Sequence, residues 1–316
     1  MSIMITNTKA GSSNTLRGDR FYLLTKAAGL FVIVALIGIL ISLIVQSWPA
    51  LEKFGLSFIW ANVWNPAADN FGGLSALSGT LITSVIAMII AVPASFAIAV
   101  FMTELTPRRF KRPLKILIDM MAGIPSIIYG MWGLFIFVPF MSNEIQPWLT
   151  EHIGTLPLIG TFFSGPPLGI GVLTAGIILS FMIIPMMSSM LADILETVPV
   201  PMREASHSLG VTRAAVVCKV LFPYVRSGVI GTYMLGLGRA LGETMAVTFV
   251  IGNSHSISNM LFMPGTTISA SIANEFNEAT GHLYPGALME LALILFALTF
   301  CVILFSRLLL ARYRRH

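Results

Sequence analysis

Two oppositely charged residues stand out within a stretch that is otherwise apolar and rich in glycine. Arg239 and Glu243 are four positions apart, which places both on one face of a helix, about 6 Å apart along its axis. A guanidinium group binds tetrahedral oxyanions through paired hydrogen bonds, so Arg239 is a candidate contact for such an anion. Alternatively, the two side chains neutralise each other and only hold neighbouring helices together.

A proline in another apolar stretch marks a second candidate region. Pro125 cannot donate a backbone hydrogen bond and should break or bend a helix there, which frees backbone groups that a neighbouring helix or a water-filled cavity must satisfy. We therefore predict that Ser126 and Tyr129, together with Arg239 and Glu243, line a path for a solute. The alternative is that Pro125 only sets a kink.

A third region, between the fourth and fifth apolar stretches, predicts a helix, a turn and a second helix. Pro201 suits a first helical position, and Glu204 falls in the first turn, where the helix dipole favours a carboxylate. Gly210 can adopt the left-handed conformation of a helix end, and Thr212 can cap a helix that ends before Pro223. A short helix on a tight turn is suited to docking in a groove of a partner protein.

The composition shows which elements must position these residues. Of the 316 residues, 56% are hydrophobic and only 10% are charged, and the mean hydropathy is +0.85. A soluble domain carries about 25% charged residues, so most of this chain must face lipid. A helix that crosses a bilayer needs about 20 apolar residues. Six such stretches are present, at 27–47, 76–102, 116–141, 168–192, 227–251 and 286–310.

These stretches predict an all-α, polytopic membrane protein with six transmembrane helices. The first span, 27–47, follows a polar segment, 1–26, and a five-helix core, 76–310, contains the loop 193–226 and precedes a tail, 311–316. Lys and Arg are retained on the cytoplasmic side, and they gather in both terminal segments and in the second and fourth connections. Both termini and the loop 193–226 are therefore predicted to be cytoplasmic. This topology accounts for the net charge of +5, so we expect no nucleic-acid partner.

Several kinds of catalytic site are excluded by simple patterns. No glycine is followed by lysine, so the chain lacks a phosphate-binding loop and an ATPase site of that type. No histidine is followed by glutamate, so the zinc-hydrolase pattern is also absent. We therefore predict no catalytic residues, no metal site and no cofactor in this chain, and the energy for transport must come from a partner or an ion gradient.

The loop between the fourth and fifth spans resembles the EAA loop of binding-protein-dependent ABC import permeases, whose pattern is E-A-A-x3-G-x9-I-x-L-P. Glu204, Ala205, Gly210 and Pro223 match at the right spacing, while Ser206, Val220 and Phe222 are conservative departures from the pattern. The resemblance implies that Glu204, Ala205, Ser206 and Gly210 couple the chain to a cytoplasmic ATPase subunit. The alternative is an amphipathic linker that lies on the membrane.

Three further segments, 124–135, 236–247 and 263–276, resemble the PstC-type permease family of phosphate ABC importers, and the similarity extends from about 21 to 312. The PstA-type sister family shares parts of these motifs. The resemblance implies a core of five helices with the MetI-like permease fold and an added N-terminal span. It also implies a place in the bacterial inner membrane and translocation of inorganic phosphate by alternating access.

The resemblance implies partners as well. They are a PstA-like second permease, two PstB-like ATPase subunits that bind ATP-Mg, and a periplasmic PstS-like phosphate-binding protein. Three alternatives remain open at this point. The first alternative is a permease of the same fold for sulfate, molybdate or another oxyanion. The second is a secondary transporter, and the third is a membrane scaffold or sensor that does not transport. A secondary transporter should contain an internal repeat, and no convincing repeat is present.

Overall fold

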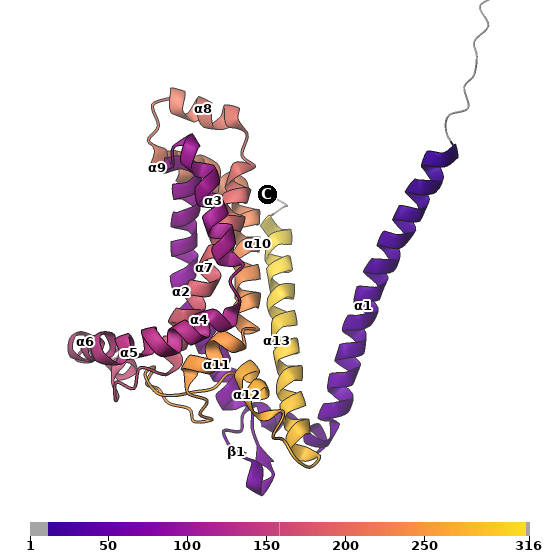
Figure 1. Ribbon diagram of the computed structural model, residues 1–316, viewed down its shortest axis with the longest axis vertical. Coiled ribbons are helices and arrows are strands. Elements are labelled where there is room, and N and C mark those ends of the chain that lie inside the picture. Colours follow the sequence, from indigo (N-terminus) through magenta and orange to yellow (C-terminus); the bar gives the residue numbers. More distant parts are fainter. Residues whose placement is uncertain (1–11, 158, 314–316) are drawn as a thin grey trace, which may run out of the picture.

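The computed structural model describes residues 12–157 and 159–313, and its ribbon is mostly helical (Figure 1). The first 11 residues of the predicted segment 1–26 and residues 314–316 of the predicted tail lie outside the described residues. Six helical segments in the described part are long and apolar enough to cross a membrane. The prediction of an all-α protein with six transmembrane helices is confirmed.

Four of the predicted spans correspond to long helices. These are α1 (Ser12–Phe54), α2 (Leu74–Val100, extended by the π-helical turn η3, Phe101–Leu105), α7 (Val172–Glu196) and α13 (Leu283–Tyr313). Their apolar cores overlap the predicted ranges, and the differences lie at the ends. The predicted ranges mark only the apolar stretch that can cross a bilayer, and a helix can continue beyond that stretch.

The third span departs from its predicted bounds. Helix α3 (Arg108–Ala122) ends before Pro125, and the chain resumes as α4 (Ser126–Trp132), α5 (Val138–Phe140) and α6 (Gln146–His152). The predicted range 116–141 therefore joined two elements, and the apolar segment is Ser126–His152. The prediction of a break at Pro125 is confirmed, because the proline lacks an N–H and disfavours helical backbone before it. Figure 1 shows α4 to α6 running across the long axes of α2 and α7.

The fifth span is broken as well. It consists of α9 (Arg213–Val216), the π-helical turn η7 (Val217–Leu221) and α10 (Phe222–Leu241), which run on without interruption, and then α11 (Met245–Ile251) after a turn. The expectation that a helix ends before Pro223 is wrong. The remaining elements are η1 (Gly55–Ile59), η2 (Pro66–Ala68), η6 (Gly160–Phe163), α8 (Val200–Ser208) and α12 (Ile268–Glu275).

A shared feature explains how three prolines are tolerated near the starts of α5, α6 and α10. Pro139, Pro147 and Pro223 each lie two residues after a π-helical turn, namely η4 (Gly133–Phe137), η5 (Met141–Ile145) and η7. A proline ring clashes with the carbonyl group four residues before it, and a wider turn moves that carbonyl group aside. The helix therefore continues past each proline, which is the physical reason for the error at Pro223.

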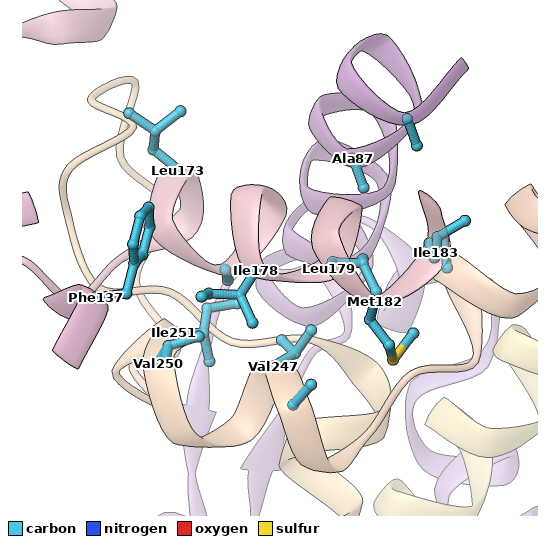
Figure 2. Packing of buried hydrophobic residues seen from close by; sticks show 14 of the residues in the cluster. Ala87, Phe137, Leu173, Ile178, Leu179, Met182, Ile183, Val247, Val250 and Ile251 are labelled. Atoms are coloured by element: carbon cyan, nitrogen blue, oxygen red, sulfur yellow. The ribbon is translucent and has the colours of Figure 1, made fainter. Parts of the chain in front are cut away.

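The core is built around α7. Its buried side chains face α2 on one side and α11 on the other, and Figure 2 shows Ile178 and Met182 of α7 gathered with Val247 and Val250 of α11, with Ala87 of α2 nearby. Gly176 allows the closest approach of α2 and α7, because a Cβ atom there would lie 2.6 Å from Ile86. The two helices therefore pack as one block.

The first helix stands apart from this block. Figure 1 shows α1 leaning away from the other helices and meeting them only near α13. The contact lies at Gly286 of α13, where a Cβ atom would be 3.7 Å from that of Ala50. Most apolar side chains of α1 are exposed, with Phe31 at 72%, so lipid is the natural surrounding of this helix.

The two ends of the molecule differ in structure. Helix α8 lies at one end, and a short antiparallel hairpin of β1 (Trp64–Asn65) and β2 (Asn70–Phe71) lies at the opposite end (Figure 1). The hairpin pairs Trp64 with Phe71 and Asn65 with Asn70. The loop 252–267 and helix α12, which directly follows it, reach the same end, so two distant parts of the chain meet there.

Candidate functional site

The structure brings together the two short helices that follow the two breaks. Helix α4 packs against α11 through Gly130, where a Cβ atom would lie only 3.0 Å from the Cα of Ala246. Glycine is therefore required for this approach, as in other tightly packed membrane helices. The break after Pro125 and the break around Gly242 consequently lie in neighbouring parts of the fold.

Glu243 has a structural partner within its own segment. Its side chain is 9% exposed, and its Oε1 accepts a hydrogen bond from the backbone N–H of Ala246 at 3.2 Å. The carboxylate therefore caps the start of α11, where the helix dipole favours a negative charge. Because α10 ends at Leu241, the prediction that Arg239 and Glu243 lie on one face of one helix is wrong.

Arg239 lies in the last turn of α10, and its side chain is exposed. Within residues 12–157 and 159–313 it makes no hydrogen bond or ion pair, so the alternative of a self-neutralising pair with Glu243 is not observed. A cation inside an apolar span is costly to leave in lipid. Its guanidinium group is therefore free to bind a partner or a solute.

Ser126 and Tyr129 both lie on α4, directly after the break. Ser126 is half-buried at the first position of the helix. The hydroxyl of Tyr129 donates a hydrogen bond to the carbonyl oxygen of Met121 at 3.1 Å, which bridges the break between α3 and α4. Tyr129 also lines an apolar hollow of about 480 Å³ with Trp132 and Phe181. The tyrosine therefore holds the kink, which satisfies one carbonyl group freed by Pro125.

The predicted coupling residues lie on α8 and in the turn after it. Glu204 and Ala205 are exposed, Ser206 is half-buried, and Gly210 has φ +73 with open space around it. The positive φ predicted for Gly210 is confirmed. Glu204 lies in the second turn rather than the first, because α8 begins at Val200.

The second half of the predicted motif has the expected cap. The Oγ1 of Thr212 accepts a hydrogen bond from the backbone N–H of Ala215 at 3.4 Å, so this residue caps α9 as predicted. The turn between α8 and α9 is therefore defined by a left-handed glycine at one side and a capping threonine at the other.

An ion pair between α8 and η3 was not predicted from the sequence. Arg203, on α8, forms an ion pair with Glu104 of η3, and both side chains are largely buried, at 17% and 11% exposed. They border a cavity of about 670 Å³ whose charged lining includes Glu104, Arg108, Lys111, Arg203, Glu204 and Arg213. The two partners are 99 positions apart, so no local pattern could have joined them.

A second group that the sequence did not reveal lies at the hairpin end. Glu275 of α12 accepts hydrogen bonds from the indole N–H of Trp64 at 2.7 Å and from the hydroxyl of Tyr284 at 2.6 Å. Its other oxygen lies 2.6 Å from Nε2 of His255, and the ring of His255 stacks on Trp64 with centroids 4.5 Å apart. Burial alone would raise the pKa of Glu275, but the hydrogen bonds from His255, Tyr284 and Trp64 outweigh it and lower the pKa.

The described residues contain no group of three or more His, Cys, Asp or Glu side chains that is arranged to hold a metal ion. The polar groups described above act as caps, tethers and exposed cations. Such an arrangement can bind and position charged groups, and the breaks at Pro125 and Gly242 supply points at which helices can change direction.

Comparisons with known proteins are consistent with this geometry. Residues 91–315 match the family described as binding-protein-dependent transport system inner membrane component. The chain is 51% identical over 300 residues to the phosphate transport system permease protein PstC of Xylella fastidiosa, covering 95% of this chain and 92% of that protein. It is 48% identical over 312 residues to the protein of the same name from Haemophilus influenzae, with 99% of each chain covered.

More distant matches agree. The probable phosphate transport system permease protein PstC of Methanocaldococcus jannaschii is 38% identical over 304 residues. Among solved structures, a chain of the MetNI methionine ABC transporter in an inward-facing conformation is similar with a TM-score of 0.52 at 16% identity. That similarity covers 76% of this chain and 93% of the other, and it supports the predicted MetI-like fold. The chain therefore belongs to the family of binding-protein-dependent transport system inner membrane components.

Proposed function

We propose that this chain is a transmembrane permease subunit of an ATP-binding-cassette importer and that it translocates inorganic phosphate. The observation that carries this proposal is the 51% identity to a phosphate transport system permease protein over 95% of the chain. That length includes both broken spans and α8, so the likeness is not confined to the apolar helices. As a member of its family, the chain is a multi-pass inner membrane protein and a transport component.

We further propose the partners that such an importer requires. A PstA-like permease would complete the path, two PstB-like subunits would bind and hydrolyse ATP-Mg, and a PstS-like protein would deliver phosphate. The exposed helix α8, with Glu204, Ala205 and Gly210, supports docking of an ATPase subunit at that end. Arg108, Lys111 and Arg213 beside α8 support a cytoplasmic orientation for it, which labelling of a cysteine at position 213 from outside the cell would contradict.

Arg239 is the residue proposed to contact phosphate along the path. Three features support this role: the side chain is exposed, it has no partner in the described part of the chain, and it lies in the last turn of α10, next to the break at Gly242. A guanidinium group replaces water around an oxyanion through two parallel hydrogen bonds. Ser126 is proposed to line the same path, while Tyr129 and Glu243 would hold α4 and α11 in place beside it.

The decisive experiment is phosphate uptake by proteoliposomes that contain the complete complex and the binding protein, with and without ATP at the nucleotide sites. We expect ATP-dependent uptake of phosphate and no uptake of sulfate or molybdate. Uptake of another oxyanion instead would identify a different solute. ATP hydrolysis without uptake of any anion would favour a scaffold or sensor.

The same assay tests Arg239. Arg239→Gln should assemble at the normal level but lose uptake by at least about tenfold, because glutamine cannot supply a cation to a dehydrated anion. Arg239→Lys should retain part of the uptake. The matched control is Glu243→Gln, which keeps an oxygen to cap α11 and should transport nearly normally. Normal uptake by Arg239→Gln would exclude a direct role in binding the solute.

A further inference from the structure

Helix α8 is weakly attached to the rest of the molecule. It has nine residues, and most of its side chains are exposed, including Val200 at 60% and Met202 at 37%. An isolated helix of this length is marginal in water, so contacts must determine where it lies. The hydroxyl groups of Ser206 and Ser208 bond only to carbonyl groups within the same helix.

Arg203 is the exception. Among the α8 residues whose side chains the structure describes, it alone forms hydrogen bonds to other elements. Its Nη1 donates to the carboxylate of Glu104 in η3, and its Nη2 donates to the carbonyl oxygen of Leu195 at 2.5 Å. One planar guanidinium group thus connects α8 to the ends of two different helices.

The chemistry of these two acceptors suits a cation. Leu195 lies one residue before the end of α7, where the last carbonyl groups have no partner within the helix and the dipole is negative. Glu104 belongs to the π-helical turn that ends α2. Because Arg203 and Glu104 are both largely buried, water competes less for this pair than for a surface ion pair.

The two helices held in this way reach the centre of the molecule. Helices α2 and α7 pack closely at Gly176, and α7 continues to Met187, whose sulfur would lie 2.5 Å from a Cβ atom at Gly236 of α10. Helix α7 also packs against α11, which follows the break that contains Glu243. A displacement of α8 that is passed to the ends of α2 and α7 would therefore reach both broken spans through closely packed helices.

We propose that Arg203 is a positioning residue that transmits movement of α8 to α2 and α7 together, by binding Glu104 and the Leu195 carbonyl group at the same time. This inference rests on the proposed function, since it concerns how ATP hydrolysis is linked to transport. Its role is distinct from docking: Glu204 and its neighbours would face the ATPase subunit, whereas Arg203 faces the transmembrane helices.

The test uses the complete complex in proteoliposomes and measures phosphate taken up per ATP hydrolysed. Arg203→Gln should leave ATP hydrolysis within about twofold of the unchanged complex while uptake per ATP falls about tenfold. Arg203→Lys keeps the charge but not the two-point geometry, so its uptake per ATP should lie between the values of the unchanged complex and Arg203→Gln. Glu104→Gln removes the same ion pair from the other side and should lower the ratio in the same direction.

The matched control is Arg213→Gln. Arg213 lines the same cavity and, within the described part of the chain, makes no hydrogen bond or ion pair, so its loss should leave uptake per ATP unchanged. An equal loss in this control would overturn the proposal, because the effect would then come from net charge. A normal ratio in Arg203→Gln would overturn it, as would failure of both Arg203→Gln and Glu104→Gln to assemble. Absence of uptake by the unchanged complex would contradict the proposed function instead.

Discussion

At the end of the molecule that carries the hairpin, side chains from three other segments meet at the carboxylate of Glu275, whereas at the opposite end α8 is connected through the guanidinium group of Arg203. The first arrangement is a hydrogen-bonded cluster of partly buried aromatic and charged groups. The second leaves a nine-residue helix largely exposed. The hairpin end is therefore expected to be rigid and the α8 end to be movable. An element that is held through one side chain is displaced most easily when that side chain loses its contacts.

The largest expected effect is the loss of the Glu275 acceptor. Glu275→Ala should lower the free energy of unfolding by about 3 kcal/mol, because the N–H of Trp64 and the hydroxyl of Tyr284 would remain partly buried without a partner. Thermal denaturation of the detergent-solubilised protein, followed by size-exclusion chromatography, measures the change. Glu278→Ala, an exposed carboxylate three residues later, is the control and should change little. Equal stability of both variants would mean that the hydrogen bonds to Glu275 do not stabilise this end of the molecule.

Acidification should weaken the same end. Since the pKa of Glu275 is lowered in the folded chain, ionised Glu275 contributes stability fully above its unfolded pKa of about 4.3, and this contribution is lost as the pH falls through the lower folded value. The stability difference between the unchanged chain and Glu275→Ala should therefore be constant near neutral pH and shrink in acid. A difference that grew on acidification would contradict this sign.

A smaller, local effect is expected at the α8 end. Gly210→Val should strain the turn by about 1–2 kcal/mol, because a β-branched residue is disfavoured at φ +73 even though open space surrounds the position. Gly210→Asn is the matched control, since asparagine tolerates the left-handed region. We expect the valine variant to keep its membrane level and thermal stability while ATP-driven uptake falls severalfold. If the asparagine variant lost as much uptake, backbone strain would not be the cause.

The two ends also differ in how far the sequence predicted them. The helix, the left-handed Gly210 and the cap at Thr212 follow from spacing within one loop, and all three are present. The Glu275 cluster joins residues up to 211 positions apart, so no local pattern announces it. Apolar periodicity finds spans but not their geometry. It placed the second half of α3 in the third span, and it placed Glu243 on a helix that ends at Leu241.

The proposed path shows the same limit. Residue chemistry singled out Arg239, and the structure adds that it is exposed and unpaired within the described residues. The broken helices were foreseeable at Pro125 because proline acts locally. The break at Gly242 was not, because glycine is equally common inside packed membrane helices.

The smallest expected effect concerns a more exposed contact on the α8 side of the molecule. Lys115 of α3 forms an ion pair with Asp193 of α7, and the two side chains are 35% and 57% exposed. An ion pair this exposed contributes about 0–1 kcal/mol, so Lys115→Gln should lower stability far less than Glu275→Ala. The control is Lys219→Gln, an exposed lysine without an ion pair in the described chain.

The pH dependence should run opposite to that of Glu275. The hydrogen bond from Lys115 to Asp193 raises the pKa of the lysine, so its contribution is complete below the unfolded pKa of about 10.4 and is lost as the pH rises through the folded value. A double-mutant cycle with Asp193→Asn at neutral pH isolates the pair, and the coupling should shrink further at high ionic strength. A coupling free energy as large as the effect of Glu275→Ala would show that this ion pair fixes α3 to α7. In that case only α8, and not the whole end of the molecule that carries it, would be more movable than the hairpin end.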